Sequence, residues 1–322
     1  MTGYAAAMRR AVLDVGANTV NLLVGDDSCG PVPVHAWKSR PSPASWLGPH
    51  GDVEEPGRWL LIEAVAEAVT EARGAGAETL FAYATAVIRD APNRDQVLDE
   101  IAEATGVRLR LLSGVEEAGL TFRAARSWLG WQAGPMLLAD IGGGTLELGQ
   151  GAGRLPDWAV SLPLGARRLT REFLRDGDPP SPRAVRRLRR HVRARLHDVV
   201  PARSTGTPVA ASKTFQQLAR LTGAAPLTEG PFVARRLHRT ALRPWIDRLA
   251  ALPAARRARL PGVSEHRARQ SLAGAIVAYE VMRALDVRSV RICPWGLREG
   301  ILVDGLEGGT GWIPWPALEL AA

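Results

Sequence analysis

Apolar and polar positions alternate along the chain in a way that predicts strands and helices in turn. Two short apolar segments, residues 10–13 and 136–139, are each followed by an aspartate, a glycine-containing turn and a second β-rich segment. This order is typical of a strand, a tight loop and a second strand. Apolar residues at helical spacing predict helices over residues 57–73, 94–105, 114–128, 182–200 and 264–285, the last being the longest. Residues 31–57 are rich in Pro, Ser and Gly and predict an irregular loop.

The two aspartate-containing turns share one design. Asp14 and Asp140 close the first apolar segment of each pair, and each turn ends in a hydroxyl residue, Thr19 or Thr145. Glycine lets backbone N–H groups converge on one anion, while the aspartate can hold a hard cation beside it. A single glycine run is usually only a hairpin turn. Two copies instead predict duplicated halves that face a shared phosphate-binding cleft, with these candidate phosphate-binding residues: Gly16, Ala17, Asn18, Thr19, Gly142, Gly143, Gly144 and Thr145.

Two further segments place polar residues where a predicted strand gives way to a helix. Arg89 follows the strand over residues 78–84, at the carboxyl end where ligands of open α/β sheets bind. Ser212, Lys213 and Thr214 open a helix after a strand that ends at Ala211, and a lysine with two hydroxyls at a helix start is a natural anion site. A solvated arginine is the alternative for Arg89.

Two adjacent glutamates open the helix over residues 114–128. Ser113 and Glu116 match a capping box, which accounts for one carboxylate. Adjacent side chains at a helix start project in different directions. We therefore expect Glu116 to cap the helix and Glu117 to face the cleft.

Length and composition allow two domains of ordinary size. The 322 residues divide at a glycine- and proline-containing linker into residues 1–133 and 134–322. No apolar run approaches the ~20 residues that a membrane span needs, and no secretion signal precedes Arg10, so we expect no membrane partner and a cytoplasmic location. Cys29 and Cys293 are far apart, which makes a disulfide framework improbable.

The net charge of +8 points to an anionic partner. Lysine occurs only at positions 38 and 213, so the positive charge is nearly all arginine, whose guanidinium fork suits phosphate oxygens. The helix predicted over residues 182–200 has a narrow apolar stripe, and its arginines occupy the rest of its surface. This basic surface is either simply solvated or a binding surface for a polyanion. Nucleic acid is disfavoured because no reader motif occurs and aromatic residues do not interleave with these arginines.

The motifs together resemble the Ppx/GppA phosphatase family, which comprises exopolyphosphatases and guanosine pentaphosphate phosphatases. The resemblance runs from Leu13 to about Leu302. It rests on six blocks in the family's order: residues 14–19, 84–93, 112–120, 140–147, 161–165 and 297–300. Ala17, Gly119, Thr19 and Thr145 depart from the family's usual residues.

The resemblance implies an α/β fold with two ribonuclease H-like domains of the actin- and hexokinase-like ATPase type flanking a central cleft. It also implies that Glu117 is the catalytic base and that Arg89 binds the terminal phosphate. Asp140 and Glu147, with Asp14, would organise Mg²⁺. The activity implied is hydrolysis of the terminal phosphate of inorganic polyphosphate, and a homodimer is the expected assembly.

Three other functions stay open at this point. Hydrolysis of pppGpp would use the same residues. A kinase or ATPase of the same fold would need an adenosine pocket. A non-catalytic polyanion- or nucleic-acid-binding protein would explain the charge alone.

Overall fold

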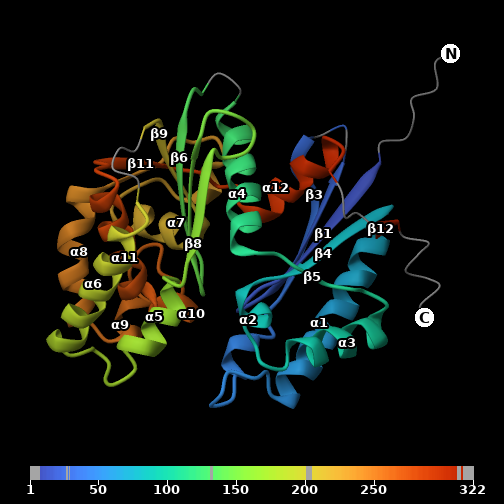
Figure 1. Ribbon diagram of the computed structural model, residues 1–322, viewed down its shortest axis with the longest axis horizontal. Coiled ribbons are helices and arrows are strands. Elements are labelled where there is room, and N and C mark those ends of the chain that lie inside the picture. The colour runs from blue at the N-terminus through green and yellow to red at the C-terminus, as the bar shows by residue number, and fades with distance from the viewer. Residues whose placement is uncertain are drawn as a thin grey trace. The chain divides into compact units, whose positions relative to one another are not determined.

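The chain forms two compact units. A computed structural model describes residues 8–26, 28, 30–130, 133–200, 205–309 and 313–314. Unit 1 comprises the chain up to Ser113 together with the segment from Leu297, and unit 2 comprises Gly114–Gly296 (Figure 1). The expected division between residues 133 and 134 differs from this one. The helix that follows Ser113 has its contacts in unit 2, and the helix that follows Gly296 has its contacts in unit 1.

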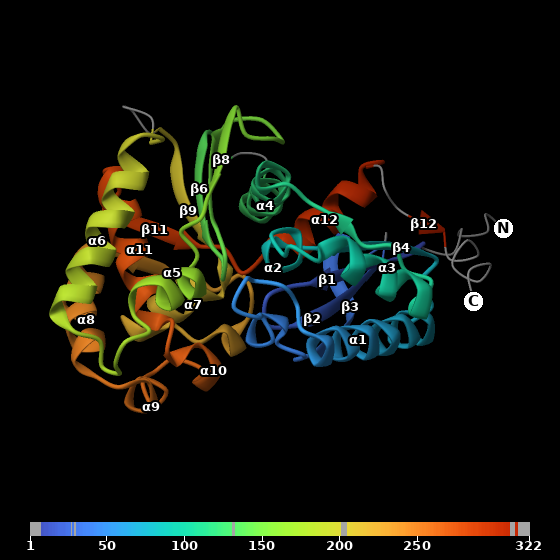
Figure 2. The same ribbon diagram turned by 60° about the horizontal axis from the view of Figure 1, so that its bottom comes forward.

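Unit 1 contains a mixed sheet with helices on both faces. Its strands follow the order β3 (Gly30–Ser39), β2 (Val20–Asp26), β1 (Arg9–Val15), β4 (Thr79–Ala84) and β5 (Arg110–Leu111), and β12 (Ile313–Pro314) also pairs with β4. The pairs β1–β2 and β2–β3 are antiparallel, whereas β1–β4 and β4–β5 are parallel. Helices α1 (Glu55–Gly74) and α3 (Arg94–Thr105) cover one face and α12 (Leu297–Leu306) the other (Figure 2). Because both faces are covered, β1 and β2 are apolar along most of their length.

Unit 2 repeats the same strand order. Its sheet runs β8 (Trp158–Leu162), β7 (Leu146–Gly151), β6 (Met136–Ile141), β9 (Thr207–Ala211), β11 (Ser289–Ile292) and β10 (Arg236–His238). The pairs β6–β7 and β7–β8 are antiparallel, and β6–β9 and β9–β11 are parallel, as in unit 1. The equal topology confirms the duplication that the two aspartate-containing turns predicted.

Helices cover both faces of the unit 2 sheet. On one face α4 (Gly114–Leu129) packs Phe122 and Ala125 against Met136 and Leu138. The other face carries the larger core, formed by α5 (Ala166–Phe173), α6 (Pro182–His197), α7 (Ser212–Leu221), α8 (Arg239–Ala251) and α11 (Ser271–Ala284). Short helices α2 (Ala86–Arg89), α9 (Ala254–Arg257), α10 (Glu265–Ala268), η1 (Pro43–Ser45) and η2 (Leu227–Glu229) complete the two units. No helix among the described residues could cross a bilayer.

Two expectations about secondary structure were wrong. Much of the segment over residues 31–57 is not a loop, because β3 occupies its first part as an edge strand, where proline removes no hydrogen bond that the sheet needs. The helix expected over residues 264–285 is two helices, α10 and α11, and the longest helix is α1 with 20 residues. At the break the hydroxyl of Ser271 donates to the carbonyl of Ala268 at 2.7 Å, and the carbonyl of Arg269 accepts from Nη1 of the buried Arg257 at 3.3 Å. Of the two cysteines, Cys293 is buried and Cys29 lies outside the described residues.

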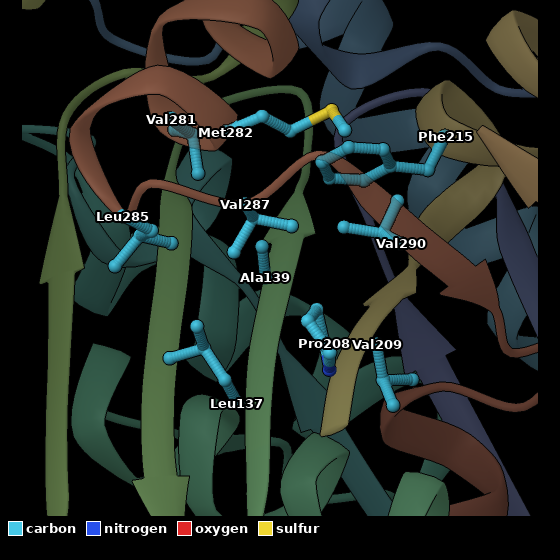
Figure 3. A pocket seen from close by; sticks show the side chains of 10 residues that line it. All are labelled: Leu137, Ala139, Pro208, Val209, Phe215, Val281, Met282, Leu285, Val287 and Val290. Atoms are coloured by element: carbon cyan, nitrogen blue, oxygen red, sulfur yellow. The ribbon is translucent and has the colours of Figure 1, made fainter. Parts of the chain in front are cut away.

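A small gap remains in the core of unit 2 between the sheet and α11. Figure 3 shows its apolar lining, which includes Leu137, Phe215, Met282 and Val290. The gap measures about 10 Å³, room for about one water molecule. A water there would find no polar partners, so we interpret the gap as a dry packing defect and not as a ligand site.

Candidate active site

The two predicted phosphate-binding turns have the same backbone geometry. In the first turn (residues 16–19) the N–H of Gly16 donates to the carbonyl of Thr19, and in the second (residues 142–145) that of Gly142 donates to Thr145, both at 2.9 Å. The flanking strands pair in the same register, Asp14 opposite Asn21 in unit 1 and Asp140 opposite Glu147 in unit 2. Each turn therefore presents an acid and a polar partner side by side.

Hydrogen bonds to α5 orient the peptide groups of the second turn. The carbonyls of Gly142, Gly143 and Gly144 accept from N–H groups at or next to the first turn of α5, at 3.0–3.1 Å. In a trans peptide the N–H points opposite to the carbonyl of the same unit. The N–H groups of residues 143–145 are therefore directed away from α5, where they can converge on an anion.

Gly165 allows this close approach. A Cβ atom at Gly165 would overlap the backbone of Gly143, Gly144 and Thr145. No other residue would fit between the turn and α5 without moving the backbone.

The first turn is held in the same way by η1. The carbonyl of Ala17 accepts from the N–H of Ala44, and that of Asn18 accepts from the N–H of Ser42, both at 3.2 Å. The same trans-peptide argument directs the N–H groups of Asn18 and Thr19 away from η1. Each unit thus holds one turn whose N–H groups could bind an anion.

Buried carboxylates gather beside the second turn. Glu147 on β7 is 4% exposed and Glu117 in the first turn of α4 is 7% exposed, whereas its neighbour Glu116 is exposed. The expectation that Glu116 and Glu117 point in different directions is confirmed. The hydroxyl of Ser161 donates to Glu147 Oε1 at 2.8 Å, and Gly114 is packed so closely on Ser161 that a Cβ could not fit. Ser161 therefore connects the start of α4 with Glu147.

The pKa of Glu147 responds to burial and to the neighbouring carboxylates. Burial raises the pKa of Glu147 well above its usual value, and the charges of Glu117 and Asp140 raise it further. Burial likewise raises the pKa of Asp140 to about 6, although Ser212 and Arg267 act in the opposite direction. Unit 2 therefore concentrates negative charge at one point, an arrangement that a bound cation would stabilise.

Asp14 has a different environment. Its Oδ2 accepts from Asn21 Nδ2 at 3.4 Å and lies 3.9 Å from Arg298 Nε at the start of α12. Burial raises the pKa of Asp14, while Arg298 and the hydroxyl of Tyr83 lower it. The charge of Asp14 is thus compensated within unit 1 by an arginine, whereas the neighbouring charges that act on Glu147 in unit 2 are carboxylates.

The segment from Ser212 to Thr214 lies where β9 enters α7. Ser212 has a φ of 79°, an unusual value for a residue with a side chain, and its buried hydroxyl lies close enough to Asp140 to lower the pKa of that carboxyl. Thr214 is buried and donates to the carbonyl of Ile141 at 2.8 Å, so its hydroxyl joins α7 to β6. Lys213 is exposed. Binding of phosphate by Ser212, Lys213 and Thr214 stays a prediction.

Arg89 is engaged by the protein. Its Nη1 donates to the carbonyl of Leu112 at 2.6 Å, and its Nε lies 3.5 Å from Asp90 Oδ1. Leu112 lies just before α4 in the sequence. The hydrogen bond from Arg89 therefore fixes the backbone a few residues before Glu117. A phosphate contact by Arg89 stays a prediction.

Sequence reasoning missed four neighbours of the site: Asn21, Arg298, Arg267 and the role of Ser161. The signal for Asn21 is present in the sequence, because Asn21 follows Asp14 by the same seven positions by which Glu147 follows Asp140. Arg298 and Arg267 come from distant helices, and no local pattern predicts which turn they reach.

The sequence is similar to a known protein family and to several known proteins. The model described as the Ppx/GppA phosphatase family matches residues 48–308. Exopolyphosphatase 1 of Mycobacterium tuberculosis is 46% identical over 315 residues, covering 95% of this chain and 91% of that protein. An uncharacterized protein of Streptomyces coelicolor is 50% identical over 310 residues, covering 95% and 92%.

Solved structures share the fold. The Ppx/GppA family member of Aquifex aeolicus superposes with a TM-score of 0.79 at 24% identity, covering 94% of this chain and all of that one. An exopolyphosphatase from Cytophaga hutchinsonii gives 0.81 at 20% identity, covering 94% and 99%.

The duplicated sheets and the similarity to these proteins define an α/β enzyme with two domains of the actin-like ATPase fold. Within that class, the chain belongs to the Ppx/GppA phosphatase family.

Proposed function

We propose that the protein is an exopolyphosphatase, which removes the terminal phosphate of inorganic polyphosphate by hydrolysis. The similarity to Exopolyphosphatase 1 supports this reaction. The observation that supports it most within the structure is the second turn. Its N–H groups are directed away from α5, and a group of buried carboxylates lies beside it.

Glu117 would orient the attacking water and take its proton. It is the buried one of two adjacent glutamates, and it lies close enough to Glu147 to raise the pKa of that residue. General base catalysis of this kind contributes typically 10²–10⁴ in rate. The N–H groups of both turns would bind phosphate oxygens, because phosphoryl transfer depends mainly on positioning and charge stabilisation.

The carboxylates of unit 2 fit Mg²⁺. The described residues contain no group of three or more His, Cys, Asp or Glu that could form a complete protein site. Mg²⁺ does not require one, because it commonly uses one or two carboxylates, waters and the substrate's phosphates. Asp140 and Glu147, which face each other across β6 and β7, would hold the ion. When bound, it would neutralise the negative charge of the phosphate chain. Asp14 fits less well because Arg298 already compensates its charge.

Phosphate release tests the proposal. Wild-type protein and the variants Glu117→Gln and Glu116→Gln would be assayed with long-chain polyphosphate, tripolyphosphate, pppGpp and ATP, each with Mg²⁺ and with EDTA. We expect polyphosphate hydrolysis that EDTA abolishes. We also expect a loss of at least ~10² for Glu117→Gln and near wild-type rates for Glu116→Gln, because only Glu117 is buried in the site.

Each of the following results would refute one part of the proposal. Full turnover by Glu117→Gln would remove Glu117 from the mechanism. Undiminished hydrolysis with EDTA would remove the metal. Release from pppGpp without release from polyphosphate would replace the substrate, and tight duplex DNA binding without phosphatase activity would replace the enzyme by a binding protein.

A further inference from the structure

Helix α6 carries an unusual concentration of positive charge. It contains seven arginines, two histidines and no acidic residue. Its apolar side faces the core of unit 2 through Val185, Leu188, Val192 and Leu196. The charged residues therefore occupy the remaining circumference.

Two of the arginines are used inside unit 2. Arg189 and Arg193 both bind Glu280 on α11, which is 1% exposed, with their closest atoms 3.1 and 2.9 Å away. Their place on the helix lies between the apolar side and the outer side. They stabilise the packing of α6 on α11.

Four other arginines form an outward row: Arg183, Arg186, Arg187 and Arg190. All four are exposed and follow the spacing i, i+3, i+4 and i+7, which places them on one face, opposite Leu188 and Val192. Within the part of the chain that the structure describes, none of the four forms an ion pair. Like charges at this spacing destabilise a helix, so the row costs stability that no acidic residue recovers.

The row is connected to the second turn by α5. Arg167 at the start of α5 donates its N–H to the carbonyl of Gly143, and Arg171 follows one helical turn later and is exposed. Phe173 on α5 then contacts α6, with its ring 5.2 Å from the guanidinium of Arg187 and 4.8 Å from the ring of His191. Figure 1 shows α5 beside α6. Arginines of α5 and α6 thus lie between the turn and the outward row, with one acidic residue, Glu172, close enough to His191 to raise the pKa of that histidine.

The charges along this path influence one another. Burial and the charges of the neighbouring Arg267 and Arg171 together lower the pKa of Arg167 to about 10. Such mutual repulsion would be relieved by a bound anion. The path therefore favours a ligand that carries several negative charges.

The surroundings of the row indicate which polyanion fits. Its outer face has no large apolar side chain, which membrane-associated helices need for insertion. It also has no aromatic residue on which nucleic-acid bases could stack. Guanidinium groups that recognise only phosphate oxygens suit a flexible chain of phosphates.

We propose that Arg171 and the outward row of α6 form a second binding site for polyphosphate. This site would hold the part of the polyphosphate that extends beyond the phosphate groups bound at the second turn. This inference rests on the proposed function. The row itself spans about 10 Å along α6, and Arg167 and Arg171 lie about 6 Å apart along α5. Only chains long enough to pass α5 gain these contacts, so the site would make affinity depend on chain length.

The test removes the row and leaves the second turn unchanged. One variant carries Arg183→Gln, Arg186→Gln, Arg187→Gln and Arg190→Gln. A control variant with the same change in net charge carries Arg236→Gln, Arg256→Gln, Arg259→Gln and Arg288→Gln, four exposed arginines of unit 2 that have no ion pair among the described residues. Binding of long-chain polyphosphate and of tripolyphosphate is measured with EDTA, and phosphate release is measured with Mg²⁺.

We expect the row variant to bind long-chain polyphosphate about 16-fold more weakly, which corresponds to a twofold loss for each exposed pair. The KM for the long chain should rise accordingly with kcat unchanged, and tripolyphosphate should be unaffected. The slope of log affinity against log salt concentration should become less negative by up to about 3, because each phosphate contact of a flexible chain contributes about 0.7.

Three results would overturn the inference. The first is equal long-chain binding by the row and control variants. The second is an equal loss for tripolyphosphate, which would place the effect at the turn. The third is a loss of binding to DNA or to anionic vesicles while polyphosphate binding persists. Absence of phosphate release from wild-type protein would refute the proposed function instead, and the binding measurements would still decide about the row.

Discussion

Glu280 is the residue whose removal should most clearly reveal how α6 is held. Its carboxylate is 1% exposed and binds Arg193 through both oxygens, with Nε at 2.9 Å and Nη2 at 3.0 Å. Arg189 Nε donates to it at 3.1 Å and Arg283 Nε at 2.9 Å. The substitution Glu280→Gln keeps the shape and removes the charge on which these bonds depend.

The expected cost follows from the exposure of the partners. Removing one member of a fully buried ion pair costs about 3–5 kcal/mol. Here the side chains of Arg193 and Arg283 are 44% and 49% exposed, so water can solvate them after the substitution. Hydrogen bonds to charged groups contribute about 1.5–3 kcal/mol, and we expect a loss of about 2–3 kcal/mol. For a unit of this size that loss lowers Tm by about 4–12 °C.

The loss should depend on pH in a defined direction. Burial alone would raise the pKa of Glu280, but the hydrogen bonds and charges of Arg193 and Arg189 hold it below the ordinary 4.5. A carboxylate with a lowered pKa in the folded state stabilises the protein above its unfolded pKa, and this stabilisation is lost as pH falls through the folded value. The difference between wild type and Glu280→Gln should therefore be constant from pH 7 to about 5 and shrink below pH 4.5.

Thermal unfolding followed by circular dichroism measures both quantities. Glu265→Gln is the matched control, because Glu265 is an exposed glutamate of the same unit, and its Tm should stay within about 2 °C of wild type. A Tm for Glu280→Gln equal to that of the control at pH 7 would refute the reasoning. So would a difference that grows as the pH falls.

Two further predictions concern packing. Gly165→Ala should lower the rate of phosphate release by at least ~10², because the added methyl group overlaps the backbone of the second turn. Gly119→Ala, whose methyl group meets no atom within 4 Å, should keep its activity and raise the free energy of unfolding by up to about 1 kcal/mol. Kinetics and Tm of both variants test this, and equal activity of the two variants would contradict it. Val290→Ile should fill the gap lined by Leu137 and Phe215 and raise the free energy of unfolding by up to about 0.8 kcal/mol. Denaturant unfolding measures this, with Val290→Ala for comparison. A loss of stability in Val290→Ile would show that the gap cannot accept the added methylene group.

Local patterns predicted the parts of the fold that local chemistry determines. The two hairpins could be recognised because apolar segment, aspartate, turn and second strand are contiguous, and the equal topology of the two sheets confirmed the duplication. β3 was missed because its prolines, tolerated at a sheet edge, indicate a loop when read in isolation. The break between α10 and α11 depends on the side chain of Arg257, which is distant in sequence.

The division into units could not be predicted for a similar reason. The glycine-rich linker near residue 133 looks like a boundary, but α4 precedes it and packs Phe122 against β6 of unit 2. In the same way α12 returns to unit 1, where Leu302 fills the space beside Gly25, 3.1 Å from where a Cβ would lie. Both assignments depend on contacts between segments far apart in the chain. Arg298 became a neighbour of Asp14 only through this return of α12.

Duplication supplied two equal backbones, and substitution then made them chemically different. In unit 1 the position opposite the aspartate is Asn21, a neutral donor, and Arg298 compensates Asp14. In unit 2 the same position is Glu147, and Glu117 adds a further carboxylate. We therefore expect the first turn to suit an anion alone, and the second to suit an anion together with a cation. This asymmetry favours unit 2 as the place of the proposed chemistry, because Arg267 offsets the charge of Asp140 only in part and the charge of Glu117 adds to that of Glu147.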